Sequence, residues 1–186
     1  MSETLEPALP DHLDRQAERL MHAVCDRKLK LASAESCTGG MFAALMTDIE
    51  GCGHGFDRGF VTYSNEAKEQ LLGIDRELLD RNDAVSEVVA RAMAEGALQR
   101  SDADIALGVT GFAGPGAPDQ EEGLVHFALA RSGRPTAHRD EHFGPLGRGA
   151  IRVKSLKAML EMLEKALETG VVPPLFQTRE IRDGRS

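Results

Sequence analysis

The stretch Lys28–Ile49, KLKLASAESCTGGMFAALMTDI, predicts the unit on which the fold is built. Its beginning, Lys28–Ala34, is a candidate strand, and the polar, glycine-containing segment Ser36–Gly40 turns the chain into a helix. The apolar face of this helix consists of Met41, Phe42, Leu45 and Ile49. A strand that leads through a short turn into an amphipathic helix is a building block of layered α/β domains.

Helices and strands continue to alternate on both sides of this unit. The other predicted helices cover about residues 11–27, 65–72, 86–100 and 148–168, and the other predicted strands cover 59–63, 105–109, 123–130 and 136–143, while 75–81 is ambiguous. The last two strands, joined by Ser132–Pro135, form an antiparallel hairpin. The sequence therefore predicts an α/β fold, a single three-layer domain with a mixed β-sheet flanked by helices.

Apolar side chains at helical spacing support the first and last helices. The first, with Asp11 as its expected N-cap, has an apolar face made of Leu13, Ala17, Leu20, Met21 and Val24. The last has an apolar stripe made of Val153, Leu156, Leu160, Leu163 and Leu167. Ser64 and Ser86 are expected to cap two middle helices. These limits divide the chain into a flexible N-terminal arm (1–10), a folded domain (11–170) and a C-terminal tail (171–186).

Composition excludes several classes of protein. The 186 residues include 22 basic and 30 acidic side chains, and a net charge of −8 disfavours nucleic-acid binding. The longest stretch without a charge, Ile105–Pro118, is shorter than the roughly 20 apolar residues of a membrane-spanning helix, so no membrane partner is expected. Three cysteines without a CxxC pair, and an N-terminus without a signal peptide, indicate a reducing cytoplasm. The six histidines show no metal-ligand spacing, so no metal is expected.

Two polar segments after predicted strands are candidates for chemistry. A serine at the start of a helix, such as Ser36, lies beside free backbone N–H groups that stabilise a phosphate or an oxyanion, although a plain N-cap is the simpler reading. Ser64 and Lys68 are four residues apart on a helix, and a buried lysine can act as a general base. A capping serine and a solvated lysine are the simpler reading there. Tyr63, the only tyrosine, is either a core ring or a donor in the site.

Two further features are weaker signals. The glycines of Thr110–Gly116 allow close approach of a ligand, but the segment matches neither the triphosphate-binding nor the dinucleotide-binding pattern. The chain also has no GxSxG elbow. Arg148 and Arg152 open the last helix, where a basic residue opposes the helix dipole. Either they bind an anion or they pair with surface carboxylates.

Taken in order, four strings resemble the CinA C-terminal domain family over roughly residues 11–168. They are AESCTGG (34–40), GFVTYSNEAK (59–68), AVSE (84–87) and TGFAGP (110–115). The characterised activity of that family is deamidation of nicotinamide mononucleotide by PncC-type enzymes, a step of NAD salvage in the pyridine nucleotide cycle. CinA proteins often carry a further N-terminal domain, and this chain is similar to the stand-alone amidase form.

The resemblance implies a cytoplasmic serine amidase, a hydrolase that needs neither a cofactor nor a metal and forms a homo-oligomer. Matched by position, Ser36 is the nucleophile, Lys68 its general base, and Tyr63 and Thr110 support the site. An arginine at the start of the last helix belongs to the family's site, with Arg148 the closer match and Arg152 the alternative. Contacts to the small-molecule substrate, nicotinamide mononucleotide, are expected at Cys37, Thr38, Gly39, Gly111, Arg148 and Arg152.

The sequence departs from the family pattern in two places. The stretch Gly116–Gly123 is shorter than the usual loop and lacks its Lys-Pro, and Leu146–Arg148 replaces the more usual Gly-Asp-Arg. Both departures lie near the expected mononucleotide site and bear on the substrate more than on the dyad. An alternative reading is a non-catalytic ligand-binding or regulatory domain associated with competence or DNA damage. A nuclease fits poorly with the acidic charge.

Overall fold

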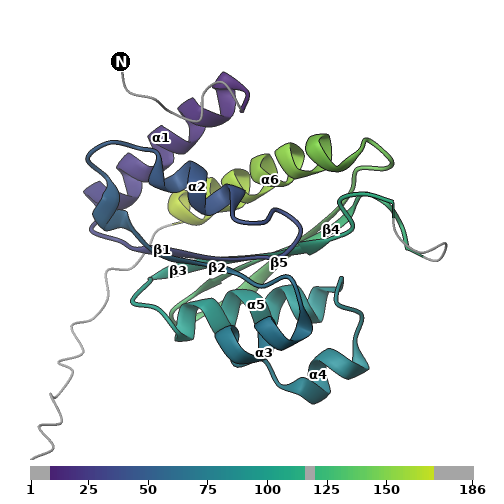
Figure 1. The fold of residues 1–186 in the computed structure, drawn as a ribbon. Helices are drawn as coiled ribbons and strands as arrows, with labels where there is room; N and C mark the ends of the chain where they lie inside the picture. Colours follow the sequence, from purple (N-terminus) through teal and green to yellow (C-terminus); the bar gives the residue numbers. More distant parts are fainter. Residues whose placement is uncertain (1–8, 116–119, 170–186) are drawn as a thin grey trace, which may run out of the picture.

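A five-stranded mixed sheet forms the middle layer of the protein (Figure 1). The computed structural model describes residues 9–115 and 120–169. The strand order is β2-β1-β3-β4-β5, in which β2 and β3 run parallel to β1 and the other pairs are antiparallel. The strands are β1 (Leu31–Glu35), β2 (Phe56–Val61), β3 (Ile105–Gly111), β4 (Leu124–Arg131) and β5 (Arg134–His142). The predicted mixed sheet and its terminal hairpin are confirmed.

Helices cover both faces of the sheet, which confirms the predicted α/β fold with three layers (Figure 1). One face carries α1 (Asp11–Asp26), α2 (Met41–Thr47) and α6 (Arg148–Glu168). The other carries α3 (Asn65–Leu72), α4 (Arg76–Arg81) and α5 (Glu87–Gln99). A short 3₁₀ turn, η1 (Gly53–Gly55), precedes β2. In the described part of the chain no helix is long and apolar enough to cross a membrane.

The apolar faces predicted for the outer helices form the larger core. All five residues of the α1 face are buried, and so is the α6 stripe except for the partly buried Val153. A second core lies under α5 and contains Ala32, Ala34, Val89, Met93 and Ala106, among others. Side chains of β1 and β3 alternate between these two cores, and because both faces of these strands are covered, they are buried almost throughout.

Some local predictions are confirmed by the structure and others are wrong. Asp11 is the first residue of α1, and Pro10 occupies its N-cap without a side-chain hydrogen bond. Ser64 and Ser86 do cap α3 and α5 through hydrogen bonds from Ala67 N and Val89 N, and the ambiguous segment 75–81 contains α4. The hairpin turn is shorter than expected because β5 already begins at Arg134. β5 is an edge strand, which tolerates a proline such as Pro135 that has no N–H to donate.

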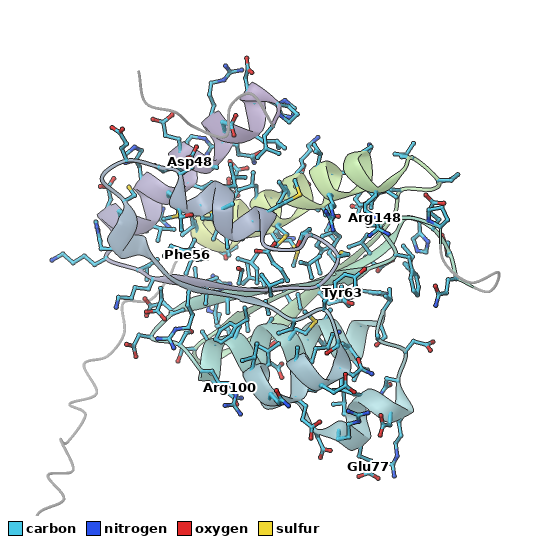
Figure 2. All side chains as sticks on the ribbon, viewed as in Figure 1. Asp48, Phe56, Tyr63, Glu77, Arg100 and Arg148 are labelled. Atoms are coloured by element: carbon cyan, nitrogen blue, oxygen red, sulfur yellow. The ribbon has the colours of Figure 1, made fainter. Side chains whose placement is uncertain are left out.

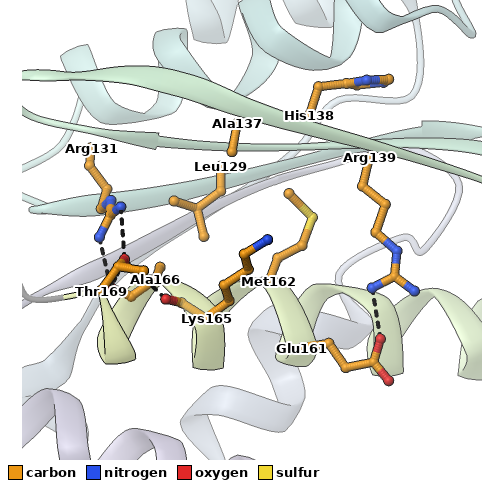
Figure 3. A pocket seen from close by; sticks show the side chains of 10 residues that line it. All are labelled: Leu129, Arg131, Ala137, His138, Arg139, Glu161, Met162, Lys165, Ala166 and Thr169. Atoms are coloured by element: carbon orange, nitrogen blue, oxygen red, sulfur yellow. Dashed lines mark hydrogen bonds and ion pairs between the residues drawn. The ribbon is translucent and has the colours of Figure 1, made fainter.

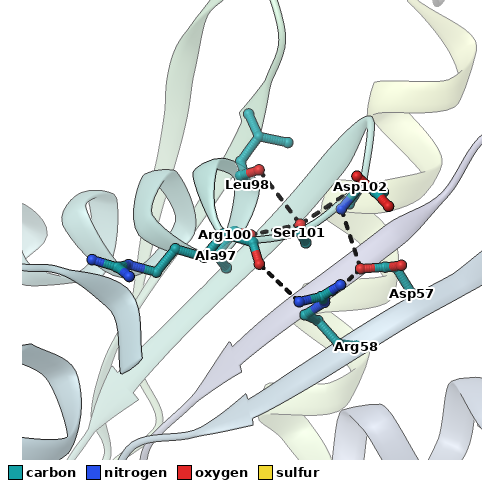
Figure 4. Close-up of polar contacts among 8 residues, drawn as sticks. Asp57, Arg58, Ala97, Leu98, Arg100, Ser101 and Asp102 are labelled. Atoms are coloured by element: carbon teal, nitrogen blue, oxygen red, sulfur yellow. Dashed lines mark hydrogen bonds and ion pairs between the residues drawn. The ribbon is translucent and has the colours of Figure 1, made fainter. Parts of the chain in front are cut away.

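Polar contacts tie edge strand β2 to the turn between α5 and β3 (Figure 4). Asp57 Oδ2 accepts hydrogen bonds from Arg58 Nε at 2.6 Å and from Asp102 N at 3.2 Å, and Arg58 Nη1 donates to Arg100 O at 3.0 Å. Burial raises the pKa of Asp57, but the hydrogen bonds from Arg58 and Asp102 outweigh it and lower the pKa overall. β2 starts earlier and ends earlier than predicted, so Thr62 and Tyr63 follow the strand.

Candidate active site

The register of the three parallel strands brings three hydroxyl residues into one row. Glu35 pairs with Val61 on one side and with Val109 on the other. Ser36 N donates to Val109 O at 3.0 Å, and Thr62 N donates to Glu35 O at 2.8 Å. The next positions along the strands are therefore Ser36, Thr62 and Thr110, and strand alternation puts them on the face covered by α3 and α5. They lie at the carboxyl ends of the strands, where open α/β sheets bind ligands.

Lys68 on α3 is buried without a counter-charge. Its side chain is 1% exposed, and none of the described carboxylates lies within ion-pair distance of its ammonium. Burial lowers the pKa of Lys68, opposed most strongly by Cys37 and then by Glu66. Lys68 belongs to α3, one of the helices that cover the face of the sheet on which Ser36 lies. The reading of Lys68 as a solvated lysine is wrong, whereas the capping role of Ser64 is confirmed.

The Glu35 carboxylate occupies the N-terminus of α2. It is fully buried and accepts hydrogen bonds from Ser33 Oγ, Thr38 Oγ1, Gly40 N, Phe42 N and Ala43 N, at 2.7–3.2 Å. Ser36 is therefore not the N-cap of α2, which is Gly40, and the helix N–H groups expected to be free are taken. A role for Glu35 was not predicted, because a carboxylate that caps a helix from five residues before its N-cap has no local sequence pattern.

Two N–H donors beside Ser36 have no backbone acceptor. Gly39 N donates to Ser36 O and Met41 N to Thr38 O, whereas the N–H groups of Cys37 and Thr38 have no backbone acceptor among the described residues and lie against the Cys37 thiol, a weak acceptor. Burial raises the pKa of the Cys37 thiol to about 12, so this thiol stays protonated and is a poor nucleophile. The turn thus offers one hydroxyl and two adjacent N–H donors.

The two threonines beside Ser36 differ in their partners. Thr110 Oγ1 donates to Ala84 O at 2.7 Å, which ties β3 to the segment before α5. Thr62 Oγ1 is buried and has no hydrogen-bond partner among the described residues. A buried polar group without a partner is rare in native proteins, so Thr62 Oγ1 is an unusual atom of this row. Thr62 was not predicted as a site residue, although the alternation of side chains along the strand after Gly59 was an available signal.

Two arginines of α6 reach the glycine-containing turns. Arg152 Nε donates to Cys37 O at 2.8 Å, across 115 residues of sequence, and its guanidinium lies over Gly39. The guanidinium of the exposed Arg148 lies over Gly114, where a Cβ would come within 3.2 Å of Arg148 Nη2. The structure therefore places the two arginines at different turns, and neither has a carboxylate partner in the described part of the chain.

The chain as a whole matches a known protein family. The family model described as CinA C-terminal domain matches residues 13–167. The chain belongs to the CinA C-terminal domain family. The resemblance inferred from the four sequence strings is confirmed.

Curated relatives of this CinA-family chain carry general names. A "Putative competence-damage inducible protein" of Caldicellulosiruptor bescii is 41% identical over 161 residues, which are 83% of this chain and 38% of the relative. A "CinA-like protein" of Syntrophus aciditrophicus is 45% identical over 150 residues, 80% of this chain and 36% of the relative. The chain thus spans less than two fifths of the length of these relatives.

Solved structures of CinA proteins share the fold over nearly their whole length. The competence/damage inducible protein CihA of Agrobacterium tumefaciens is 41% identical with a TM-score of 0.82, and the match covers 86% of this chain and 98% of that chain. A CinA superfamily protein of Escherichia coli is 31% identical with a TM-score of 0.77, and the match covers 83% and 90%.

Two further predicted site residues of the CinA-family chain, Tyr63 and Gly111, differ in their surroundings. Tyr63 is 66% exposed, so its reading as a core ring is wrong, and Figure 2 shows it toward the same end of the view as Arg148. A Cβ at Gly111 would lie 2.7 Å from the Val125 side chain. The close packing of β4 against this position is therefore sufficient to explain the glycine. Residues 116–119 of the shortened loop lie outside the described residues. In the described ranges no group of three or more histidine, cysteine or acidic side chains is arranged to hold a metal.

Proposed function

We propose that the protein is an amidohydrolase, a nicotinamide-nucleotide amidase, that hydrolyses the carboxamide of nicotinamide mononucleotide to nicotinate mononucleotide and ammonia. The observation that carries the proposal is the buried Lys68 ammonium, which has no described counter-charge and belongs to α3, a helix on the face of the sheet where Ser36 lies. Burial favours the neutral amine, and a neutral lysine beside a serine is the working form of a Ser-Lys dyad.

The first step is acylation of Ser36. Neutral Lys68 Nζ takes the proton of Ser36 Oγ while this oxygen attacks the carboxamide carbon and the carbonyl π electrons move to the oxygen. The N–H groups of Cys37 and Thr38, which have no backbone acceptor among the described residues, receive this oxyanion. Loss of one such donor costs about 3–4 kcal/mol in comparable sites.

The second step releases ammonia and regenerates the serine. Protonated Lys68 donates its proton to the leaving nitrogen as the C–N bond breaks, which leaves an acyl group on Ser36. A water molecule then attacks the acyl carbon and gives a proton to Lys68, the bond from the acyl carbon to Ser36 Oγ breaks, Lys68 returns the proton to this oxygen, and nicotinate mononucleotide leaves. In this proposal Thr110 holds the segment around Ala84 against the site, and Tyr63 contacts the substrate from the exposed side.

The phosphate of the mononucleotide is assigned to Arg148. Arg152 already donates to Cys37 O and so positions the Ser36 turn, whereas Arg148 is exposed and keeps its guanidinium donors for a ligand. That the enzyme works in the cytoplasm as a homo-oligomer, without metal or cofactor, stays a prediction of the family resemblance.

The test measures ammonia and nicotinate mononucleotide after incubation of the purified protein with nicotinamide mononucleotide. Free nicotinamide, which lacks the phosphate, serves as the control substrate. We expect turnover of the mononucleotide only, with a loss of about 10³-fold or more in Ser36→Ala and in Lys68→Ala, as in other serine dyads and triads. Full activity of the Ser36→Ala variant contradicts the proposal.

A non-catalytic ligand-binding or regulatory domain is the second candidate. It is favoured by the names of the relatives, which refer to competence and damage, and by the change at Leu146–Arg148 next to the arginine assigned to phosphate. Saturable binding of the mononucleotide without ammonia release would support this candidate over the amidase.

A further inference from the structure

A cleft of about 300 Å³ lies between the C-terminal half of α6 and the β4–β5 hairpin (Figure 3). Its apolar part is formed by Leu129, Ala137, Met162 and Ala166. Its polar part is formed by Arg131, Arg139, Glu161, Lys165 and Thr169, whereas the ring of His138 turns away from the cleft (Figure 3) and stacks on His126. The walls therefore combine an apolar surface with three permanent cations and a single carboxylate.

The cleft is remote from the row of hydroxyls around Ser36. Arg131 pairs with Ile105 at the first position of β3, whereas Thr110 lies near the last position of the same strand. The cleft also opens on the face covered by α6, and the hydroxyl row faces α3 and α5. A ligand in the cleft would not touch the candidate active site.

Two of the three cations have no carboxylate partner among the described residues. Arg131 is held by hydrogen bonds from Nη1 to Ala166 O at 2.7 Å and from Nη2 to Thr169 Oγ1 at 3.4 Å, which leave further N–H donors of the guanidinium free. Burial, and then the charge of Arg134, lower the pKa of Arg131, so its positive charge is not compensated locally.

Lys165 is the second uncompensated cation. Its side chain extends from α6 toward the strands, between Met162 and Ala166 (Figure 3). In contrast, Arg139 is neutralised by ion pairs with Glu141 and Glu161. In a protein with a net charge of −8, two cations without a carboxylate partner make this cleft locally positive, which favours an anionic ligand.

We propose that this cleft binds a small organic anion, a sulfonate, carboxylate or phosphate monoester on a compact apolar body. The anionic group pairs with Lys165 and the free N–H groups of Arg131, and the apolar body covers Leu129 and Met162. Small-molecule sites generally have this composition, apolar walls with a few charged groups that orient the ligand. The proposal is independent of amidase activity.

The first experiment compares two fluorescent probes on the full-length protein. 8-Anilinonaphthalene-1-sulfonate carries the sulfonate on an aromatic body, and N-phenyl-1-naphthylamine is its neutral analogue. The protein has no tryptophan and one tyrosine, so its own emission does not interfere. We expect one saturable site for the sulfonate that weakens with added salt, and at least about tenfold weaker binding of the neutral analogue. Equal binding of both probes overturns the proposal.

Variants locate the site. Lys165→Glu changes an exposed residue and leaves the apolar wall intact, and we expect it to weaken sulfonate binding by about tenfold or more. Arg131→Gln, checked for folding by circular dichroism, is expected to weaken it as well. Lys154→Glu is the matched control, because it makes the same charge change on an exposed position of α6 outside the cleft. Unchanged binding in Lys165→Glu, or an equal loss in Lys154→Glu, contradicts a site in this cleft.

Discussion

Two buried charges at the same end of the sheet, Glu35 and Lys68, have opposite surroundings. Glu35 accepts five hydrogen bonds, three of them from backbone N–H groups at the start of α2, where the helix dipole favours an anion. Lys68 is equally buried but has no ion pair among the described residues. A satisfied buried charge stabilises the fold, whereas an unsatisfied one lowers stability and persists where it serves chemistry. The difference distinguishes Glu35, a charge that stabilises the fold, from Lys68, the charge to which we assign a catalytic role.

The largest effect is expected from Lys68→Met, which replaces the amine by an apolar side chain of similar length. Amidase activity should fall by about 10³-fold or more because the base is lost. The free energy of unfolding should rise by about 1–2 kcal/mol, since an unpaired buried charge disappears. Ammonia release and thermal melting measure the two effects. A variant that is both inactive and much less stable would show that Lys68 is a structural charge like Glu35.

Glu35→Gln, in contrast to Lys68→Met, is expected to lower the free energy of unfolding. The amide replaces an acceptor oxygen by a donor facing backbone N–H groups, which should cost about 3 kcal/mol of unfolding free energy, or roughly 6–12 °C in Tm. Thermal melting and urea unfolding measure this loss. Glu168→Gln, at an exposed position near the end of α6, is the matched control and should stay within about 0.5 kcal/mol of the parent. If Glu35→Gln melts like the control, the carboxylate is not the cap that the hydrogen bonds indicate.

The pH dependence should distinguish the lysine from the carboxylate. Burial holds the pKa of Lys68 below its ordinary value of 10.5. Below the folded-state pKa both the folded and the unfolded chain hold the proton, and the full penalty of burying the charge applies. As pH rises from there toward 10.5, only the unfolded chain stays protonated, so the penalty is relieved and stability rises.

Activity should follow the same group. It should rise about tenfold per pH unit until the folded-state pKa is reached, because only the neutral amine accepts a proton. Profiles of kcat/KM and of Tm against pH, compared with the Tm profile of Lys68→Met, measure both. A Tm difference between parent and variant that does not shrink with rising pH would contradict the assignment to Lys68.

The smallest effect concerns the threonines on either side of Ser36. Thr110→Val removes the hydrogen bond to Ala84 O and should cost about 1–2 kcal/mol. Thr62→Val removes a hydroxyl without a described partner and should leave stability unchanged or raise it by up to about 1 kcal/mol. Urea unfolding of both variants measures the difference. Equal destabilisation would mean that Thr62 is satisfied by an ordered water.

Local patterns in the sequence predicted much of the fold. The apolar faces of α1 and α6, the limits of α6 and the serine caps of α3 and α5 agree with the structure, because each depends on residues within a few positions of one another. The prediction of Asp11 as the N-cap of α1 was wrong. The N-cap is Pro10, which makes no side-chain hydrogen bond to the helix.

The site was predictable only in part. The motif strings identified the family and singled out Ser36 and Lys68. They did not distinguish a solvated lysine from a buried one, nor a serine that caps a helix from one that lies before the cap. Thr62 and Glu35 were missed because their significance depends on what surrounds them in space. The sequence does not show directly which polar side chains are buried.

By itself, the sequence determined the secondary structure, the α/β class and the family, since hydrophobic period and motif are local properties of the chain. Only the tertiary structure decided that Glu35 is satisfied and Lys68 is not, and that Arg152 donates to Cys37 across 115 residues. The physical reason is that the energy of a charge depends on its dielectric surroundings and on the hydrogen bonds it makes, and both are set by residues distant in sequence.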